Sequence, residues 1–241
     1  MKKSIKFILI ALLAVGMTSC NFDLQWGQVT GNGNVVTEER PVTSDFTAVR
    51  GSAGMDVFLT EGNENKIVVE ADENLLEIIE TEISEGQLKI RATQNIGRSK
   101  SQKVHVTYKK LEKISASSGA DVIGNSVVKT EYLTLDSSSG ADLEVDVVAR
   151  EVYADVSSGA DLKISGRADK LVADASSGSD LKAMDLEVKI CKAEASSGAD
   201  IVVNVKEEMD GKASSGGDIR YYGNPTAVTV KDGASGSVRK M

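Results

Sequence analysis

The chain has 241 residues, of which 41% are apolar and only 4% are aromatic, so its core must be built from Val, Leu, Ile and Ala. Gly is frequent (22 residues) and Pro is nearly absent (2 residues), which excludes a Pro-rich disordered linker and favours an ordered fold with many special backbone positions. A formal net charge of −8 argues against nucleic-acid binding, because such a surface repels phosphates.

Residues 1–19 have the pattern of a secretory signal peptide. Three lysines in the first six residues precede an apolar run that is too short to span a bilayer. The stretch "GMTSC" (Gly16–Cys20) resembles a bacterial lipobox, with Met17 where Leu is more usual. This predicts cleavage before Cys20 and lipidation of its thiol. Ordinary cleavage that leaves Cys20 as an incidental thiol is the alternative.

Lipidation of Cys20 predicts a protein of the cell envelope, anchored by its lipid in the outer membrane and facing the periplasm or the cell surface. Removal of residues 1–19 takes away three Lys and no acid, which leaves a formal charge of −11, so attachment must come from the lipid and not from a basic patch. Cys191 is the only other cysteine, so we expect no intramolecular disulfide and no thiolate metal site. We expect residues 20–44 to form a tether and a lead-in strand.

The first part of the expected folded domain, residues 45–227, is irregular. Three segments alternate apolar and polar residues as strands do: Asn65–Ala71, Gln87–Ala92 and Lys103–Lys109. Between the first two, "ENLLEIIETEI" has a short helical stripe through Leu76, Ile79 and Ile83. We expect these segments to be wider first rungs of the repeat described next.

The rest of the domain repeats a five-residue motif. "SSGAD" begins at residues 117, 138, 157 and 196, and the variants "SSGSD" and "SSGGD" begin at residues 176 and 214. Successive copies are 18 to 21 residues apart, and a period near twenty predicts a solenoid. A fainter copy is "GSAGMD". The glycines of these copies form a predicted structural corner column: Gly54, Gly119, Gly140, Gly159, Gly178, Gly198 and Gly216.

The residues around each corner alternate with a period of two. An aliphatic residue stands three places after every Gly from Gly119 to Gly216, and small or aliphatic residues stand five places before it. Leucine-rich repeats need a Leu ladder and an Asn column, and helical repeats need longer periods; neither pattern is present. The remaining solution is an all-β, single-stranded parallel β-helix with about 20 residues per rung. Residues 228–241 are expected to be a C-terminal closing rung.

Each residue type in the motif has a physical role in such a corner. Gly allows a positive φ, the Ser hydroxyls can bond the corner backbone or one another, and Ala keeps the inner corner narrow. Stacked carboxylates would repel by about 1 kcal/mol per adjacent pair in water. Hydrogen bonds and nearby lysines are one answer, and a column of calcium ions is the other. The carboxylates concerned are Asp121, Asp142, Asp161, Asp180, Asp200 and Asp218.

Several stretches together resemble one known family. The lipobox, "GNGNV", "FTAVRGSAGMDVFLTEG", "VVEADENLLEIIETEISEGQLKI" and the iterated "SSGAD" are similar to the auto-transporter adhesin head domain family, which is common in Bacteroidetes. The resemblance covers about residues 45–227. It implies a right-handed parallel β-helix and an adhesin-like role, and it supplies no catalytic residues.

The sequence does not predict an enzyme. His105 lies in an alternating strand as an outward residue, and Cys191 falls in an inward apolar column, so neither is a nucleophile or base with a matched partner. Tyr132 and Tyr153 are offset by two places relative to their corners, so they need not share a face. We expect no cofactor unless the Asp column binds calcium.

The primary hypothesis is a non-catalytic, lipid-anchored adhesion or interaction module of the cell envelope. Its expected partners are the membrane, through the lipid, and a glycan or protein ligand. The alternative is a carbohydrate-binding or carbohydrate-active β-helix protein of the outer membrane. Because bare strand edges at the ends of a β-helix can pair with a second copy, a homo-oligomer is a further expectation.

Overall fold

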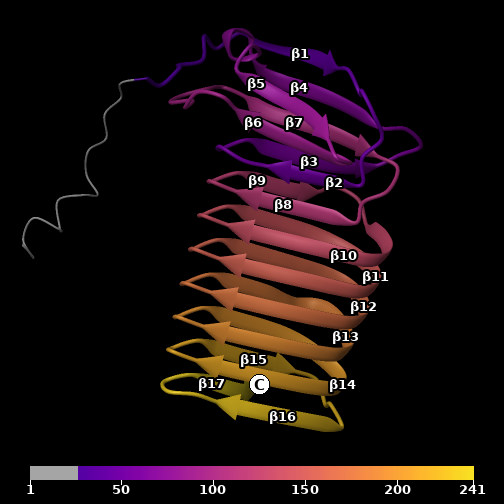
Figure 1. Ribbon diagram of the computed structural model, residues 1–241, viewed down its shortest axis with the longest axis vertical. Helices are drawn as coiled ribbons and strands as arrows, with labels where there is room; N and C mark the ends of the chain where they lie inside the picture. Colours follow the sequence, from indigo (N-terminus) through magenta and orange to yellow (C-terminus); the bar gives the residue numbers. More distant parts are fainter. Residues whose placement is uncertain (1–26) are drawn as a thin grey trace, which may run out of the picture.

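The structure is a computed structural model that describes residues 27–241, and these residues form an all-β protein with one short 3-10 turn. The strands belong to one continuous hydrogen-bonded sheet that is wound into a solenoid (Figure 1). The strands are β1 (Val35–Arg40), β2 (Ala48–Gly51), β3 (Asp56–Glu61), β4 (Lys66–Asp72), β5 (Ile79–Ser84), β6 (Gln87–Ala92), β7 (Gln102–Tyr108), β8 (Lys113–Ser117), β9 (Asp121–Gly124), β10 (Val128–Ser138), β11 (Asp142–Ser157), β12 (Asp161–Ser176), β13 (Asp180–Ser196), β14 (Asp200–Ser214), β15 (Asp218–Tyr222), β16 (Ala227–Asp232) and β17 (Ser237–Lys240), and the 3-10 turn η1 spans Glu73–Leu75.

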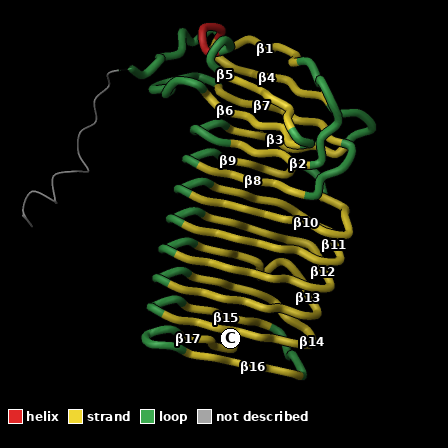
Figure 2. The backbone as a smooth tube through the Cα atoms, in the orientation of Figure 1, coloured by secondary structure: helices red, strands yellow, loops and turns green. Residues whose placement is uncertain are grey.

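The solenoid has two faces that meet at the repeated corner. We call them the pre-corner face, which holds residues before each Ser-Ser-Gly, and the post-corner face, which holds residues after it. From β8 onward each strand pairs in parallel with the equivalent strand one rung later, and the paired residues Asp142 and Asp161 are 19 positions apart. The corners stack along one edge as a row of loops (Figure 2). This confirms the predicted parallel β-helix.

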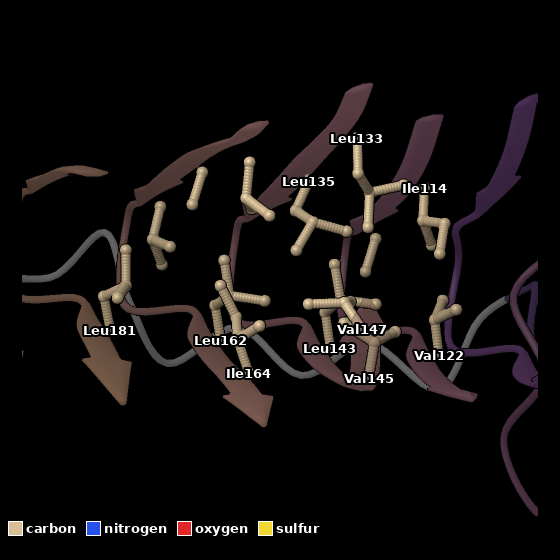
Figure 3. Close-up of a cluster of buried hydrophobic side chains, with 14 of the residues drawn as sticks. Ile114, Val122, Leu133, Leu135, Leu143, Val145, Val147, Leu162, Ile164 and Leu181 are labelled. Atoms are coloured by element: carbon tan, nitrogen blue, oxygen red, sulfur yellow. The ribbon is translucent and has the colours of Figure 1, made fainter. Parts of the chain in front are cut away.

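Stacked aliphatic side chains fill the space between the two faces. Leu143, Leu162 and Leu181 lie in register on successive rungs of the post-corner face, and each is at most 2% exposed (Figure 3). Each such side chain contributes about 1.5–3 kcal/mol when it is buried. On the pre-corner face, the stacked inward side chains become smaller from Leu135 to Ala154 and Ala173. Apolar and polar residues alternate along each strand, so one side of the wound sheet carries the apolar side chains that form the core.

The rungs at the N-terminal end are not stacked in sequence order. The rung of β2 and β3 lies between the rung of β6 and β7 and the rung of β8 and β9, and all of these contacts are parallel. A parallel rung can pair at both of its edges. β8 and β9 pair with one edge of β2 and β3, and β6 and β7 pair with the other edge. These segments therefore begin the same solenoid, but their order along its axis differs from their order in the sequence.

Antiparallel strands cover the N-terminal end of the solenoid. β4 pairs with β7 and β1 pairs with β4, while β5 pairs with β6. β1, which falls in the expected lead-in segment, is thus the outermost strand of this cap. Behind these strands Leu75, Ile78 and Ile79 are buried, so the apolar interior is closed at this end.

The helical stripe expected through Leu76, Ile79 and Ile83 is wrong for most of its length. Only η1 has helical character, and β5 continues as a strand that pairs with β6. The β-branched residues of "IETEI" favour an extended chain. The turn after β5 contains Glu85 (φ 52°) and Gly86 (φ 73°), the two positive φ values that a tight hairpin requires.

The C-terminal end is open among the described residues. β16 pairs only with β14, and β17 pairs only with β15. Val228 and Val230 lie in register above the inward residues Met209 and Gly211, yet they are 45% and 40% exposed. The two ends of the solenoid therefore differ, because one is capped and the other exposes the last layer of the core.

Replacing Leu162 with Ala should lower the free energy of unfolding by about 2–5 kcal/mol, because the deletion leaves a cavity between two neighbouring leucines. Lys163→Ala is the matched control on the outer surface and should change it by less than about 1 kcal/mol. Guanidinium unfolding followed by circular dichroism measures both. Equal effects of the two substitutions would contradict the assigned inward and outward positions.

Candidate functional site

The repeated motif forms a tight corner with two successive left-handed residues. In the six motif copies from residue 117 onward, φ of the second Ser lies between 52° and 58° and φ of the following Gly lies between 67° and 79°. The Ala120 N–H donates to the Ser117 carbonyl across the corner at 3.3 Å. Two positive φ values inside such a four-residue turn are the pattern of a type I′ turn. The predicted glycines all have positive φ, and the same conformation at Ser was not predicted.

Backbone hydrogen bonds are the regular connection between successive corners. The N–H of each corner Gly from Gly119 to Gly198 donates to the carbonyl of the second Ser on the next rung, at 3.1–3.2 Å, for example from Gly140 to Ser158. Two roles were open for the Ser hydroxyls, and among the described residues no hydrogen bond joins one corner hydroxyl to another, whereas hydroxyl bonds to the backbone are present. The buried Ser137 hydroxyl donates to the Ala141 carbonyl across its own turn, and the buried Ser179 hydroxyl donates to the Val156 carbonyl on the preceding rung. A sheet-like ladder thus passes through the bend.

The predicted Asp residues lie in one column, and Asp56 belongs to it as well. Several members have cationic partners: Lys182 Nζ lies 2.6 Å from Asp161, and Arg220 lies 3.3 Å from Asp200. Asp121 has no such ion pair among the described residues. Burial raises the pKa of its carboxyl, and the neighbouring Asp142 and Asp56 raise it further. Repulsion in the column is therefore relieved unevenly.

Within residues 27–241, no three His, Cys, Asp or Glu side chains come together in a group that could hold one metal ion. The column supplies one carboxylate per rung, whereas Ca²⁺ takes six to eight oxygen ligands. Calcium binding by this column stays a hypothesis that the geometry does not favour.

A second group of acids lines a shallow groove on the pre-corner face, which contains Asp155, Asp174, Glu194 and Lys212. Burial raises the pKa of the Asp155 and Asp174 carboxyls, and adjacent acids add to the effect. Acid–base catalysis by two carboxyls needs environments that push their pKa values apart. Asp155 and Asp174 are shifted in the same direction by the same cause, whereas hydrogen bonds from Lys192 and Lys212 lower the pKa of Glu194 in the same groove. The groove therefore contains carboxyls of both kinds, and Glu194 is held by its two lysines.

Two tyrosines lie side by side on the outer surface of the pre-corner face, where sequence reasoning did not require them to meet. Tyr132 is in register with Glu151, and Thr134 is in register with Tyr153, so the tyrosines are diagonal neighbours on adjacent rungs. They are 47% and 39% exposed. The sequence could have indicated this arrangement, because each tyrosine is directly next to an inward residue of its strand and must therefore point outward.

A charged network holds this pair. Arg150 lies over the Tyr132 ring, 5.0 Å from its centroid, and donates a hydrogen bond to Glu151 at 3.2 Å. The Tyr153 hydroxyl donates to the other carboxylate oxygen of Glu151 at 2.8 Å, and Lys170 Nζ lies 3.7 Å from that oxygen. The hydrogen bonds from Tyr153 and Arg150 lower the pKa of Glu151. We call these five residues the tyrosine patch.

The remaining candidate residues occupy ordinary structural positions. Cys191 is 1% exposed in an inward column, and burial raises the pKa of its thiol to about 12, which makes it inert near neutral pH. His105 is on the outer surface, stacked on Phe58 with ring centroids 5.3 Å apart and 3.4 Å from Glu70. Cys20, the predicted lipidation site, lies outside the described residues.

Comparisons with known proteins agree with this architecture. A family profile described as "Putative auto-transporter adhesin, head GIN domain" matches residues 45–225, which contain β2 to β15. No curated protein matches the chain significantly.

Solved structures share the fold at low sequence identity. A protein of Bacteroides fragilis described as a putative adhesin superposes with a TM-score of 0.82 at 17% identity, covering 88% of this chain and 100% of that one. Proteins of Parabacteroides merdae and Parabacteroides distasonis with the same description give TM-scores of 0.71 and 0.74 at 20% and 18% identity. Each comparison covers 89% of this chain, and 99% and 100% of the other chains.

Two glycine substitutions should separate backbone strain from collision. Gly159→Ala at a corner meets no atom within 4 Å, so its cost should be the left-handed conformation alone, about 1–2 kcal/mol. In Gly166→Ala, at a φ of 104°, the new Cβ would also collide with the Val147 carbonyl oxygen, so the loss of unfolding free energy should be clearly larger. Chemical unfolding of both variants tests the order, and a more damaging Gly159→Ala would refute the assignment.

The Asp column predicts different results for two similar substitutions. Because the folded-state pKa of Asp121 is raised, its ionisation opposes folding above the ordinary Asp pKa near 4. Asp121→Asn should therefore stabilise the protein at pH 7, by less than about 1 kcal/mol for this exposed group, and the gain should vanish below about pH 4. Asp161→Asn removes the Lys182 ion pair and should give no gain. The free energy of unfolding of both variants is measured at pH 3.5 and pH 7. Equal stabilisation by the two substitutions at pH 7 would contradict the assigned repulsion in the Asp column.

Proposed function

The chain belongs to the family described as "Putative auto-transporter adhesin, head GIN domain", and on this basis we propose that it is a lipid-anchored, non-catalytic adhesion module of the cell envelope. Family membership supports an adhesin-like protein of the cell surface or envelope. The lipid anchor at Cys20 and the absence of catalysis are our own additions. The envelope location agrees with the predicted signal peptide and lipobox.

The separation of the two chain ends is the observation that carries the proposal. Val29, near the start of the described residues, forms a bridge with Ile96 beside the capped end, whereas β16 and β17 form the opposite end (Figure 1). A lipid joined to Cys20 would therefore hold the capped end near the membrane and let the solenoid project outward. No helix within residues 27–241 is long and apolar enough to cross a membrane.

The surface of the solenoid is suited to display and less to turnover. In the groove that contains Asp155, Asp174 and Glu194, the Glu194 carboxylate is already paired with Lys192 and Lys212. A rigid backbone ladder holds outward side chains at a repeat of about 4.8 Å per rung. This supports binding of a ligand through fixed positions, and it favours adhesion over the carbohydrate-active alternative.

Replacing Cys20 with Ser in the full chain, expressed in cells that lack the wild-type protein, tests the proposal. We expect the protein to move from the outer-membrane fraction to the soluble fraction and the cells to lose the adhesion that the wild-type chain confers. Cys191→Ser is the matched control, because it also removes a thiol, and it should leave both properties unchanged. If the Cys20→Ser variant stays in the membrane fraction, the lipid anchor is refuted. If the variant is released from the membrane and the cells that express it still adhere as the wild type does, the adhesive role is refuted.

A further inference from the structure

The tyrosine patch is unusual in a chain that has few aromatic residues. Only 4% of the residues are aromatic, and Phe46 and Tyr108 are at most 3% exposed. Tyr132 and Tyr153 nevertheless lie on the outside of β10 and β11, in the middle of the solenoid (Figure 1). Leu133 and Val152 beside them are fully buried, so the register places both rings outward. The core gains little from these rings, which makes them candidates for contact with a ligand.

The charged network fixes the side chains before any ligand arrives. The Arg150 guanidinium stacks on Tyr132, and Glu151 accepts hydrogen bonds from both Arg150 and Tyr153. Lys170 on the next rung contacts the same carboxylate. Side chains that are already held in place lose less conformational freedom on binding, so such a patch binds more tightly than the same residues on a mobile loop.

The charges of the patch cancel locally. Arg150 and Lys170 are balanced by Glu151 and by Glu131, whose carboxylate lies 4.0 Å from Arg150. The chain as a whole carries a formal charge of −8. The overall field therefore disfavours anionic polymers, while the patch itself offers no excess charge to attract a cationic partner. An uncharged ligand fits both observations.

Sugar rings match the remaining chemistry. The face of an aromatic ring is negative and attracts the slightly positive C–H groups on the apolar face of a pyranose. The charged groups around the rings can exchange hydrogen bonds with neutral hydroxyls. A protein partner fits less well, because two partly exposed tyrosines supply far less than the roughly 800 Å² per partner that a stable protein interface buries.

We propose that the tyrosine patch binds a neutral glycan, with Tyr132 and Tyr153 stacking on sugar rings of adjacent units and with Arg150, Glu151 and Lys170 bonding their hydroxyls. This names the ligand of the adhesion module and rests on the proposed function. The ladder between β10, β11 and β12 sets the spacing of these contacts.

The full chain, purified in detergent, can be tested on an array of neutral and acidic oligosaccharides, followed by titration calorimetry with a neutral oligosaccharide that binds. We expect neutral glycans to bind, with a Kd that changes little between 50 and 500 mM NaCl because no net charge is neutralised. Tyr132→Ala and Tyr153→Ala should each weaken binding at least about tenfold. Met184→Ala removes a side chain that is 50% exposed outside the patch and should leave the Kd unchanged.

Circular dichroism of each variant establishes that the fold is retained, and Tyr153→Phe provides a second variant that keeps the ring. It should bind more tightly than Tyr153→Ala. Binding restricted to acidic glycans, no glycan binding, or an unchanged Kd in the Tyr132→Ala/Tyr153→Ala double variant would overturn the inference.

A parallel assay separates this inference from the proposed function. If cells bearing the wild-type chain adhere while neutral glycans do not bind, the ligand assignment fails and the adhesion module stands. If neutral glycans bind while the cells do not adhere, the glycan site stands and the adhesive role fails.

Discussion

The parallel backbone ladder is the constraint on which the rest of the structure depends. It places each residue about 4.8 Å from its equivalent on the next rung, so a residue type that suits one rung must suit its neighbours. At the corners this means that two left-handed residues recur at the same place, and the ladder continues through them from Gly N–H to Ser carbonyl. The repeated pentapeptide is the sequence record of one backbone geometry used many times.

The same constraint determines the electrostatics of the surface. Identical residues stack, so an acid that suits one corner produces a column of acids. The protein offsets this by placing cations on neighbouring rungs, as Lys182 does for Asp161 and as Lys163 does for Glu144. Where no cation is near, as at Asp121, the repulsion remains as a raised pKa. The tyrosine patch departs from the surrounding charged columns, and that departure is what marks it as a site.

The periodic part of the fold could be predicted because each rung repeats the same alternation of inward and outward residues at the same distances from its corner. Leu162 and Ala173 were assignable from spacing alone, and both are buried. The left-handed conformation of Ser158 was not assignable, because nothing in the composition distinguishes it from the Ser before it. The order of the first rungs and the strand β5 were also missed, since that region lacks the repeat and its local pattern fits a helix as well as a strand. That the two tyrosines are neighbours could not be predicted, because they are offset by two residues relative to their corners. Only the exact register between β10 and β11 shows that they are close.

The account claims that the rungs are equivalent units held in register, and deletion of one rung tests this most directly. Removing residues 161–179 deletes 19 residues and joins Ala160 to Asp180, which occupies the same place one rung later as Asp161. Circular dichroism and chemical unfolding should show a folded β protein with a cooperative transition, whereas removal of residues 161–170, half a period, should abolish that transition. An unfolded product from the 19-residue deletion, or equal behaviour of the two deletions, would contradict the claim.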